Sequence, residues 1–151
     1  MKWFTPKMFF IDSGVFIGLY NVRDENHSEA KALVEKSLKG DMRTAYTSDY
    51  VLDETVTFIR KKTTAPKLVR EAIDFIQNSG KIEILHIRRE VFASSKMCME
   101  KYPAIPLSFT DWTIANLMES KGIEYLLSFD SGFDRLSTIK KFSEIKRIGK
   151  C

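Results

Sequence analysis

Four acidic residues stand at places where a carboxylate is costly to bury. Asp12 and Asp130 each end a short apolar run, Glu54 lies within a helical pattern, and Asp111 opens another. Carboxylates that converge in a fold raise one another's pKa or require a cation. The four residues therefore predict a binding site for a divalent metal ion.

These carboxylates are hard oxygen donors, and no metal-like Cys or His spacing accompanies them. Such a donor set favours Mg²⁺ or Mn²⁺, which prefer oxygen ligands and keep several waters. These ions orient a water molecule, lower its pKa and stabilise the charge of an in-line displacement at phosphorus. The pattern therefore indicates hydrolysis of a phosphodiester.

The size and composition of the chain fit one globular domain, which we expect to span residues 1–151. The 151 residues are 44% apolar, enough to bury a substantial core. Lysine and arginine number 24 against 20 acidic residues, a net charge of +4 that suits a polyanionic partner without requiring one.

Signals of a secreted, membrane or zinc protein are weak in this sequence. The cysteines are Cys98 and Cys151, and neither lies in a C-x-x-C motif, so we expect free thiols in a reducing compartment. Asp12 interrupts the apolar segment near the start, and no uncharged apolar run approaches about 18 residues. We expect a soluble, cytoplasmic protein without a membrane segment.

Short apolar or alternating runs bounded by turn residues predict five strands. The run 8–11 is continuously apolar, which is typical of a central parallel strand, and Ser13-Gly14 is expected to end this run. The expected strands are 8–11, 44–47, 82–87, 123–129 and 144–148.

Apolar residues at helical spacing predict helices between these strands. Ser48 is expected to cap one of them. In that helix Glu54 shares a face with Val51 and Phe58, so it should point inward or along a seam. Asp111 falls in the first turn of a later helix. The expected helices cover about 30–38, 51–60, 67–78, 88–99 and 111–121, with stops near Gly40, Gly80 and Gly122 and a helical turn around 133–136.

Strands that alternate with helices predict a three-layer α/β/α fold with a central, mostly parallel sheet. In such sheets, ligands bind beyond the carboxyl ends of the strands. Asp12 and Asp130 both end strands at that edge. The strand pattern alone therefore brings at least two of the four acids together.

Four segments of the chain together resemble the PIN-domain ribonucleases, especially the small VapC-like toxins and their archaeal and bacterial relatives. Any one segment is a weak signal, but all four in this order are fairly specific, and they cover nearly the whole chain. The segments are FFIDSGVFI at 9–17, TSDYVLDET at 47–55, LSFTDWTIA at 107–115 and LSFDSGF at 127–133.

The resemblance implies a PIN-like fold and a hydrolytic endoribonuclease in which Asp12, Glu54, Asp111 and Asp130 bind the metal and act in catalysis. It places Ser13 near the metal and makes a water molecule the nucleophile. Toxins of this kind typically form homodimers and are inhibited by an antitoxin segment in the acidic groove. The expected partners are thus an RNA substrate, an antitoxin protein and a second copy of the chain.

Each candidate acid also has a purely structural interpretation. Asp12 could simply cap a turn, and Asp111 is favourable in any first helical turn because of the helix dipole. Asp49 and Asp53 lie close enough in sequence to be confused with Glu54, which could also belong to a solvated helix face. The apolar run before Asp12 and the helical phase of Glu54 favour the site interpretation.

Further polar and aromatic residues are candidates for lesser roles. His27 is expected to be a cap or surface residue, and Asp134, one helical turn after Asp130, could assist the metal from behind its ligands. Most basic pairs are interpreted as solvated surface and most aromatic residues as core. The candidates for RNA contact are 60–62, 88–89, 140–141 and 146–147, with Trp3, Tyr50 and Trp112 for base stacking.

Several functions remain open from the sequence. A housekeeping RNA-processing nuclease would use the same acids, and an adjacent gene for a DNA-binding antitoxin would distinguish a toxin from it. A catalytically inactive scaffold that binds RNA or protein is a further alternative. A phospho-accepting receiver ranks low, because it needs paired acids after its first strand, where this chain has Asp12 alone, and a lysine near the position of Asp130.

Overall fold

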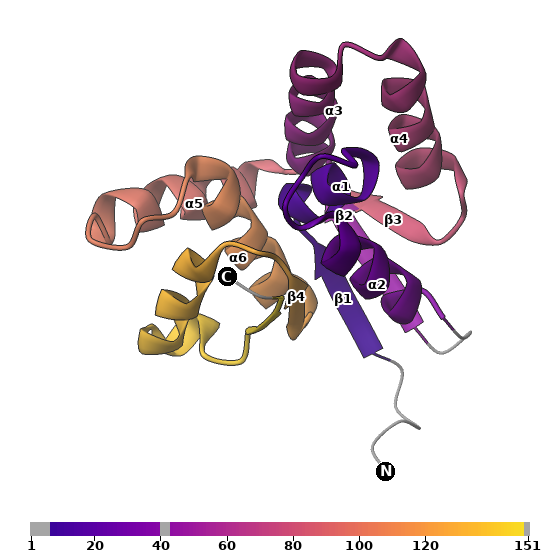
Figure 1. Cartoon of the computed structure of the whole chain (residues 1–151). Helices are drawn as coiled ribbons and strands as arrows, with labels where there is room; N and C mark the ends of the chain where they lie inside the picture. Colours follow the sequence, from indigo (N-terminus) through magenta and orange to yellow (C-terminus); the bar gives the residue numbers. More distant parts are fainter. Residues whose placement is uncertain (1–6, 40–42, 150–151) are drawn as a thin grey trace.

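The computed structural model describes residues 7–39 and 43–149. Its five strands form one sheet in the order β3-β2-β1-β4-β5, and all neighbours run parallel (Figure 1). The predicted α/β fold with a central parallel sheet is therefore confirmed. The strands are β1 (Lys7–Ile11), β2 (Arg43–Ser48), β3 (Ile82–Leu85), β4 (Tyr125–Leu127) and β5 (Lys146–Ile148).

Helices connect successive strands and flank the sheet. Figure 1 shows α3 and α4 together at the top of the molecule, whereas α5 and α6 lie to the left of β1. Among the described helices, none is long and apolar enough to cross a membrane. The helices are α1 (Ser13–Tyr20), α2 (His27–Ser37), α3 (Asp49–Thr63), α4 (Pro66–Asn78), α5 (Arg89–Lys101) and α6 (Phe109–Lys121), followed by the 3₁₀ helices η1 (Ser131–Thr138) and η2 (Lys140–Phe142).

The direction in which the chain crosses the sheet reverses once. From β1 it moves outward through β2 to β3, and it then returns to β4 and β5 on the other side of β1. In sheets of this kind, such a reversal leaves a crevice at the carboxyl ends of the two strands that flank it, here β1 and β4. Ile11 is in register with Leu127, so the residues that follow these two meet at the crevice.

The centre of the core is formed by the strands on either side of this crevice. Phe10, Ile11, Leu126 and Leu127 are at most 1% exposed. Strands buried on both faces read as continuous apolar runs, which is why β1 is visible in the sequence.

Helix α6 crosses the core and brings one of the acids to its edge. Every residue from Trp112 to Met118 is buried, and the Trp112 ring stacks on Tyr102 with centroids 5.8 Å apart. Gly122 ends the helix in a left-handed conformation, as predicted. The first turn, with Asp111, lies only half buried at the sheet edge.

The first strand ends at Ile11, as predicted, and a helix that the sequence did not predict, α1, begins directly after it at Ser13. Its residues 15–18 are all buried, so the helix has no polar face and no amphipathic period that would identify it in the sequence. Gly18 permits close packing on α2, since a Cβ there would lie 2.9 Å from the Cβ of Ala30.

Three strands are shorter than predicted: β5 begins two residues later, at Lys146, and β3 and β4 end earlier. β3 ends at Leu85, after which the Ile87 N–H donates to the Asp49 carboxylate at 3.1 Å. β4 ends at Leu127, although the Ser128 N–H still donates to the Ile148 carbonyl at 3.1 Å. In both cases hydrogen bonds at the carboxyl edge replace the expected strand pairing. The described thiol, Cys98, is buried and free; Cys151 and Gly40 lie outside the described residues.

Candidate active site

Asp12 is the first residue after β1 and is buried, with 6% of its surface exposed. It caps α1, and its Oδ1 accepts the N–H of Ser13 at 2.8 Å. Its own N–H donates to the Leu127 carbonyl at 3.0 Å, and the Ser128 hydroxyl donates to Oδ2 at 2.7 Å. Asp12 is therefore held between β1 and β4, at the crevice that the strand order creates.

Asp130 is linked to Asp12 through the same serine. Its N–H donates to the Ser128 Oγ at 3.0 Å, and its Oδ1 accepts the Gly132 N–H at 2.8 Å, which caps η1. A Cβ at Gly132 would lie 2.9 Å from that Oδ1 atom. Glycine at this position therefore lets the exposed carboxylate of Asp130 stay close to the chain.

Glu54 lies at the seam between α3 and α1. Its Oε1 accepts the Ser13 hydroxyl at 2.9 Å. Of the two residues expected to share its face, Val51 is fully buried and Phe58 is 39% exposed. Glu54 itself is exposed, so it faces along the seam and the inward orientation is excluded.

Asp111 occupies the third position of α6 and forms a capping box with Ser108. The Ser108 N–H donates to Oδ2 of Asp111 at 2.9 Å, and the Asp111 N–H donates to the Ser108 Oγ at 3.1 Å. This arrangement satisfies two backbone donors at the helix start. The structural role foreseen for Asp111 is therefore present, and it still leaves Oδ1 without a hydrogen bond from any described residue.

Electrostatic effects connect the four carboxylates. The pKa of Asp12 is raised to about 7, first by burial and then by the charges of Asp111 and Glu54, against the lowering effect of its hydrogen bonds. The pKa of Asp111 is raised to about 6, mainly by burial, with the charges of Asp130 and Glu54 adding to it. Such mutual effects require short separations, so the four side chains form one acidic group at the carboxyl edge.

The donor set of this acidic group fits a hydrated Mg²⁺ or Mn²⁺ ion. Within the described residues, 7–39 and 43–149, no group of three or more Asp, Glu, His or Cys side chains lies close enough together to bind a metal ion on its own. Mg²⁺, however, is commonly held by one or two carboxylates together with waters and substrate phosphates. Oδ1 of Asp111 and Oδ2 of Asp130 accept no hydrogen bond from a described residue, so oxygen ligands are available without breaking the local caps.

Asp49 and Asp53, the acids near Glu54 on α3, do not belong to the acidic group. The Asp49 carboxylate accepts the N–H groups of Tyr50 and Ile87 at 2.9 and 3.1 Å and lies 3.2 Å from Nδ1 of His86. It therefore ties the start of α3 to the end of β3. Asp53 is exposed, and Glu54 is the acid on this helix whose hydrogen bond reaches α1.

Asp134 and His27 are used structurally. Asp134 forms a two-pronged ion pair with Arg147, with Nε–Oδ1 and Nη2–Oδ2 distances of 2.8 and 3.0 Å, and this pairing lowers the pKa of Asp134. Nδ1 of His27 lies 2.7 Å from the Gly18 carbonyl, so it ties α2 to α1. The idea that Asp134 supports the metal is not favoured, because its carboxylate is engaged by the guanidinium.

Ser128 is the site residue that the sequence analysis did not single out. It is completely buried, and its hydroxyl both donates to Asp12 and accepts from Asp130. A polar residue at the end of a buried apolar run, two positions before an acid, is the sequence signal that could have identified it.

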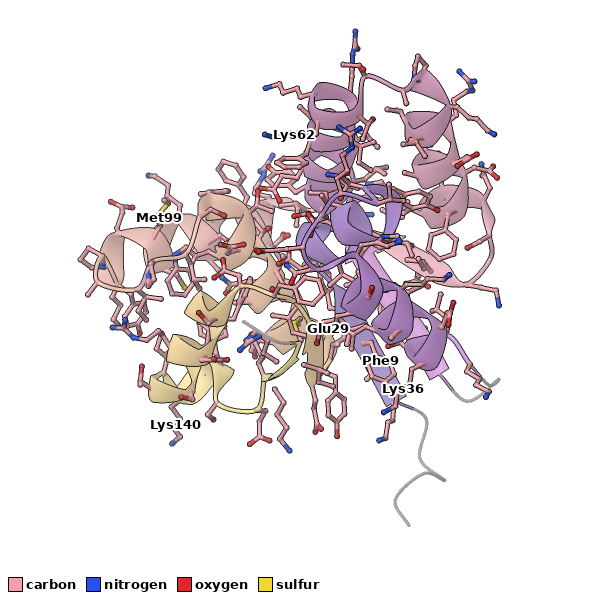
Figure 2. All side chains as sticks on the ribbon, in the orientation of Figure 1. Phe9, Glu29, Lys36, Lys62, Met99 and Lys140 are labelled. Atoms are coloured by element: carbon pink, nitrogen blue, oxygen red, sulfur yellow. The ribbon has the colours of Figure 1, made fainter. Side chains whose placement is uncertain are left out.

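The candidates for RNA contact divide into residues that are engaged in the fold and residues that are exposed. Trp112 is fully buried and Tyr50 half buried, whereas Trp3 lies outside the described residues. Nζ of Lys141 donates to Oδ1 of the buried Asn116 at 2.9 Å. Residues 60–62 and 88–89 are exposed. Figure 2 shows Lys62 on α3 and Lys140 on η2 at opposite ends of the molecule.

Comparison with known sequences adds to this geometry. The family model described as the PIN domain matches residues 9–139. A VapC ribonuclease of Archaeoglobus fulgidus is 28% identical over 128 residues, which cover 82% of this chain and 77% of the relative. The 23S rRNA-specific endonuclease VapC20 of Mycobacterium tuberculosis is 27% identical over 126 residues, covering 83% and 92%.

Solved structures share the fold. The crystal structure of M. tuberculosis VapC20, a Sarcin-Ricin loop cleaving toxin, matches with a TM-score of 0.76 at 24% identity, covering 84% of this chain and 93% of that one. A toxin–antitoxin complex from Klebsiella pneumoniae matches with a TM-score of 0.60 at 17% identity, covering 93% and 95%.

Proposed function

This chain belongs to the PIN domain family, and from that premise we propose that it is a metal-dependent endoribonuclease, the toxin of a toxin–antitoxin pair. The reaction is hydrolysis of an RNA phosphodiester within the strand. The observation that carries the proposal is the coupled acidic group of Asp12, Glu54, Asp111 and Asp130 at the crevice between β1 and β4. The four carboxylates come from four separate elements. Asp12 follows β1, Glu54 lies on α3, Asp111 lies on α6, and Asp130 caps η1.

The four carboxylates are the proposed ligands of Mg²⁺ or Mn²⁺ and the proposed catalytic residues. When bound, such an ion activates a water and stabilises charge on the phosphate oxygens. Elevated pKa values are what a buried group of carboxylates without its cation should show, because burial and, after it, neighbouring like charges both resist ionisation. The raised pKa values of Asp12 and Asp111 support this assignment.

The remaining residues of the site orient the carboxylates. Ser128 and the Ser13 N–H hold the two oxygens of Asp12, and the Ser13 hydroxyl holds Glu54. The capping box aims Asp111 at the edge. Orientation of this kind matters for catalysis because misplacing a reacting group by about 1 Å can cost about 100-fold in rate.

The substrate and the partners that we propose are inferred from the names of the similar proteins. One relative is named for 23S rRNA, so we propose ribosomal RNA as the first substrate to examine. We propose an antitoxin protein as the inhibitory partner, in keeping with the toxin–antitoxin complex that shares the fold, and a homodimer as the assembled form. Light scattering of the purified protein, alone and with the product of a neighbouring gene, measures both assemblies.

The test is cleavage of a structured RNA pool that contains 23S rRNA by the full-length protein in Mg²⁺, Mn²⁺ or EDTA. Asp12→Asn and Asp111→Asn remove one charge each with little change in shape. Asp53→Asn is the matched control, because it removes an equal charge from an exposed position next to Glu54.

Cleavage that requires the metal, is lost in both site variants and survives in Asp53→Asn supports the proposal. Cleavage that persists in EDTA or in both site variants contradicts the metal site and points to a contaminant. Absence of cleavage by the wild-type protein in every metal contradicts the nuclease assignment and favours a scaffold that only binds.

A further inference from the structure

One face of α3 leads away from the acidic group and carries three different kinds of side chain in a row. Glu54, Phe58 and Lys62 are spaced four residues apart, so they lie on the same side of the helix, with about 5–6 Å between neighbouring Cβ atoms. All three are exposed. We call this row the α3 track.

The aromatic residue of the α3 track is one of the exposed large apolar side chains of the described structure. Phe58 is 39% exposed, on a helix whose buried residues are Val51, Thr55 and Ile59. It belongs to neither of the two clusters of buried apolar residues. Nζ of Lys62 lies over the Phe58 ring, 5.7 Å from its centre, which is a cation–π distance.

Positive charge continues beyond the ring. Lys62 and Arg23 line a hollow of about 460 Å³ between the end of α1 and the end of α3. Within the described parts of the chain, neither side chain forms an ion pair with a carboxylate. Figure 2 shows Lys62 projecting from α3 toward the side of the molecule on which α5 lies.

The succession of a carboxylate, an aromatic ring and cations along α3 matches the groups that bind a single nucleic acid strand. Proteins that bind single strands combine cations that contact phosphates with aromatic rings on which bases stack, and paired bases inside a helix are not available for such stacking. An acidic peptide would satisfy Lys62 and Arg23, but it would leave the exposed ring next to the carboxylate of Glu54 unexplained.

We propose that the α3 track binds the unpaired nucleotides next to the cleaved phosphodiester: one base stacks on Phe58, and the adjoining phosphate is contacted by Lys62, with Arg23 beyond it. The inference rests on the proposed ribonuclease function and adds to it the residues that hold the substrate beside the acidic group. Phe58 and Lys62 are thus positioning residues for the substrate and take no part in the chemistry.

The test measures RNA binding without cleavage. Fluorescence anisotropy with labelled oligouridylate of about 12 nucleotides in EDTA gives the affinity of the full chain. A second oligomer of equal length has the same ribose-phosphate backbone without bases. The variants are Phe58→Ala, Phe58→Trp and Lys62→Ala, and Lys31→Ala, on α2, is the control for loss of one exposed lysine.

Each variant has its own expected signature. Phe58→Ala should weaken binding of oligouridylate by about 5- to 150-fold, leave binding of the abasic oligomer unchanged, and be rescued by Phe58→Trp. Lys62→Ala should weaken both oligomers and reduce the slope of log K against log salt by about 0.7, the value for one phosphate of a single strand. Lys31→Ala should change neither affinity nor slope.

Equal losses on both oligomers for Phe58→Ala, or no loss on either, would overturn the proposal, as would a salt slope that Lys62→Ala leaves intact. Cleavage of RNA by the wild-type protein is measured separately, so an active nuclease whose binding ignores Phe58 and Lys62 rejects the α3 track alone. A protein without any metal-dependent cleavage rejects the proposed function instead.

Discussion

The hydroxyl of Ser128 donates a hydrogen bond of 2.7 Å to Oδ2 of Asp12. The Ser128 Oγ atom also accepts the N–H of Asp130 at 3.0 Å. One buried hydroxyl at the end of β4 therefore positions an acid at the end of β1 and another at the start of η1. This relationship ties two of the four carboxylates to each other through the sheet rather than through a loop.

Replacing Ser128 by alanine should destabilise the protein and weaken cleavage. The change leaves a buried Asp12 oxygen without its donor, a loss of about 1–3 kcal/mol, and it removes an interaction that lowers the Asp12 pKa. Urea unfolding and RNA cleavage are the measurements. Ser143→Ala, which removes an exposed hydroxyl bonded only to the Lys140 carbonyl, is the control; equal behaviour of the two variants would contradict the role of Ser128.

The two adjacent acids on α3 should differ sharply in their effect on cleavage. Glu54→Gln should reduce the rate by at least the roughly 10- to 100-fold that loss of a supporting contact costs at a metal site, because Glu54 is held by Ser13 within the acidic group. Asp53→Asn should leave the rate nearly unchanged. Initial rates of RNA cleavage at saturating Mg²⁺ measure both, and a comparable loss in Asp53→Asn would show that net charge on α3, and not position, is responsible.

Without metal, the protein should become less stable as the pH rises. The Asp12 pKa in the folded state is about 7, above its ordinary value of 3.8. Between these values the folded state holds a proton that the unfolded chain has released, so the free energy of unfolding falls by at most about 1.4 kcal/mol per pH unit. Asp111, with a pKa of about 6, acts in the same direction over a narrower range.

Asp12→Asn should remove the Asp12 part of this dependence, which is the larger part above about pH 6. The variant has no proton to lose at position 12, so in EDTA its stability at pH 8 should exceed that of the wild type even though it cannot cleave RNA. Urea titrations at several pH values between 4 and 8 (about one unit apart) give the comparison. A decrease below about pH 6 belongs to Asp111, whereas a steep decrease above that pH that persists in Asp12→Asn would place the responsible titration elsewhere.

The Asp134–Arg147 pair should prove structural. Asp134→Asn should lower the free energy of unfolding by about 1 kcal/mol or less, because the aspartate is 55% exposed and the pair is screened by water. The rate of RNA cleavage should stay the same. Since pairing lowers the Asp134 pKa, this small contribution is present above the ordinary pKa of aspartate and is lost as the pH falls through the lowered value. A large loss of cleavage at unchanged stability would instead assign Asp134 to the metal site.

Much of the fold follows from local patterns in the sequence. The continuous apolar run of β1 marks a strand buried on both faces, and the cap residues Ser48 and Ser108 mark the starts of α3 and α6. These signals are readable because they depend on neighbours within a few residues. Asp12 and Asp130 could be assigned to the same sheet edge for a related reason, since parallel strands in an α/β fold present their carboxyl ends together.

Other features required the assembled molecule. Helix α1 is hidden because contacts on every side bury it, which removes the periodicity that would reveal it. The orientation of Glu54 along the seam depends on Ser13, which lies 41 residues away in sequence. The role of Asp134 depends likewise on a distant partner, Arg147.

The fold class and the strand edge could be predicted from the printed residues, and the four candidate acids could be proposed from them, because residue type, periodicity and caps are properties of short segments. How these acids act on one another depends on the folded molecule. Asp12 is buried, bonded to Ser128 and close to the charges of Asp111 and Glu54 only once β1 and β4 have paired in the folded sheet. Through-space interactions of this kind depend on distance and exclusion of water, neither of which is encoded in a local pattern.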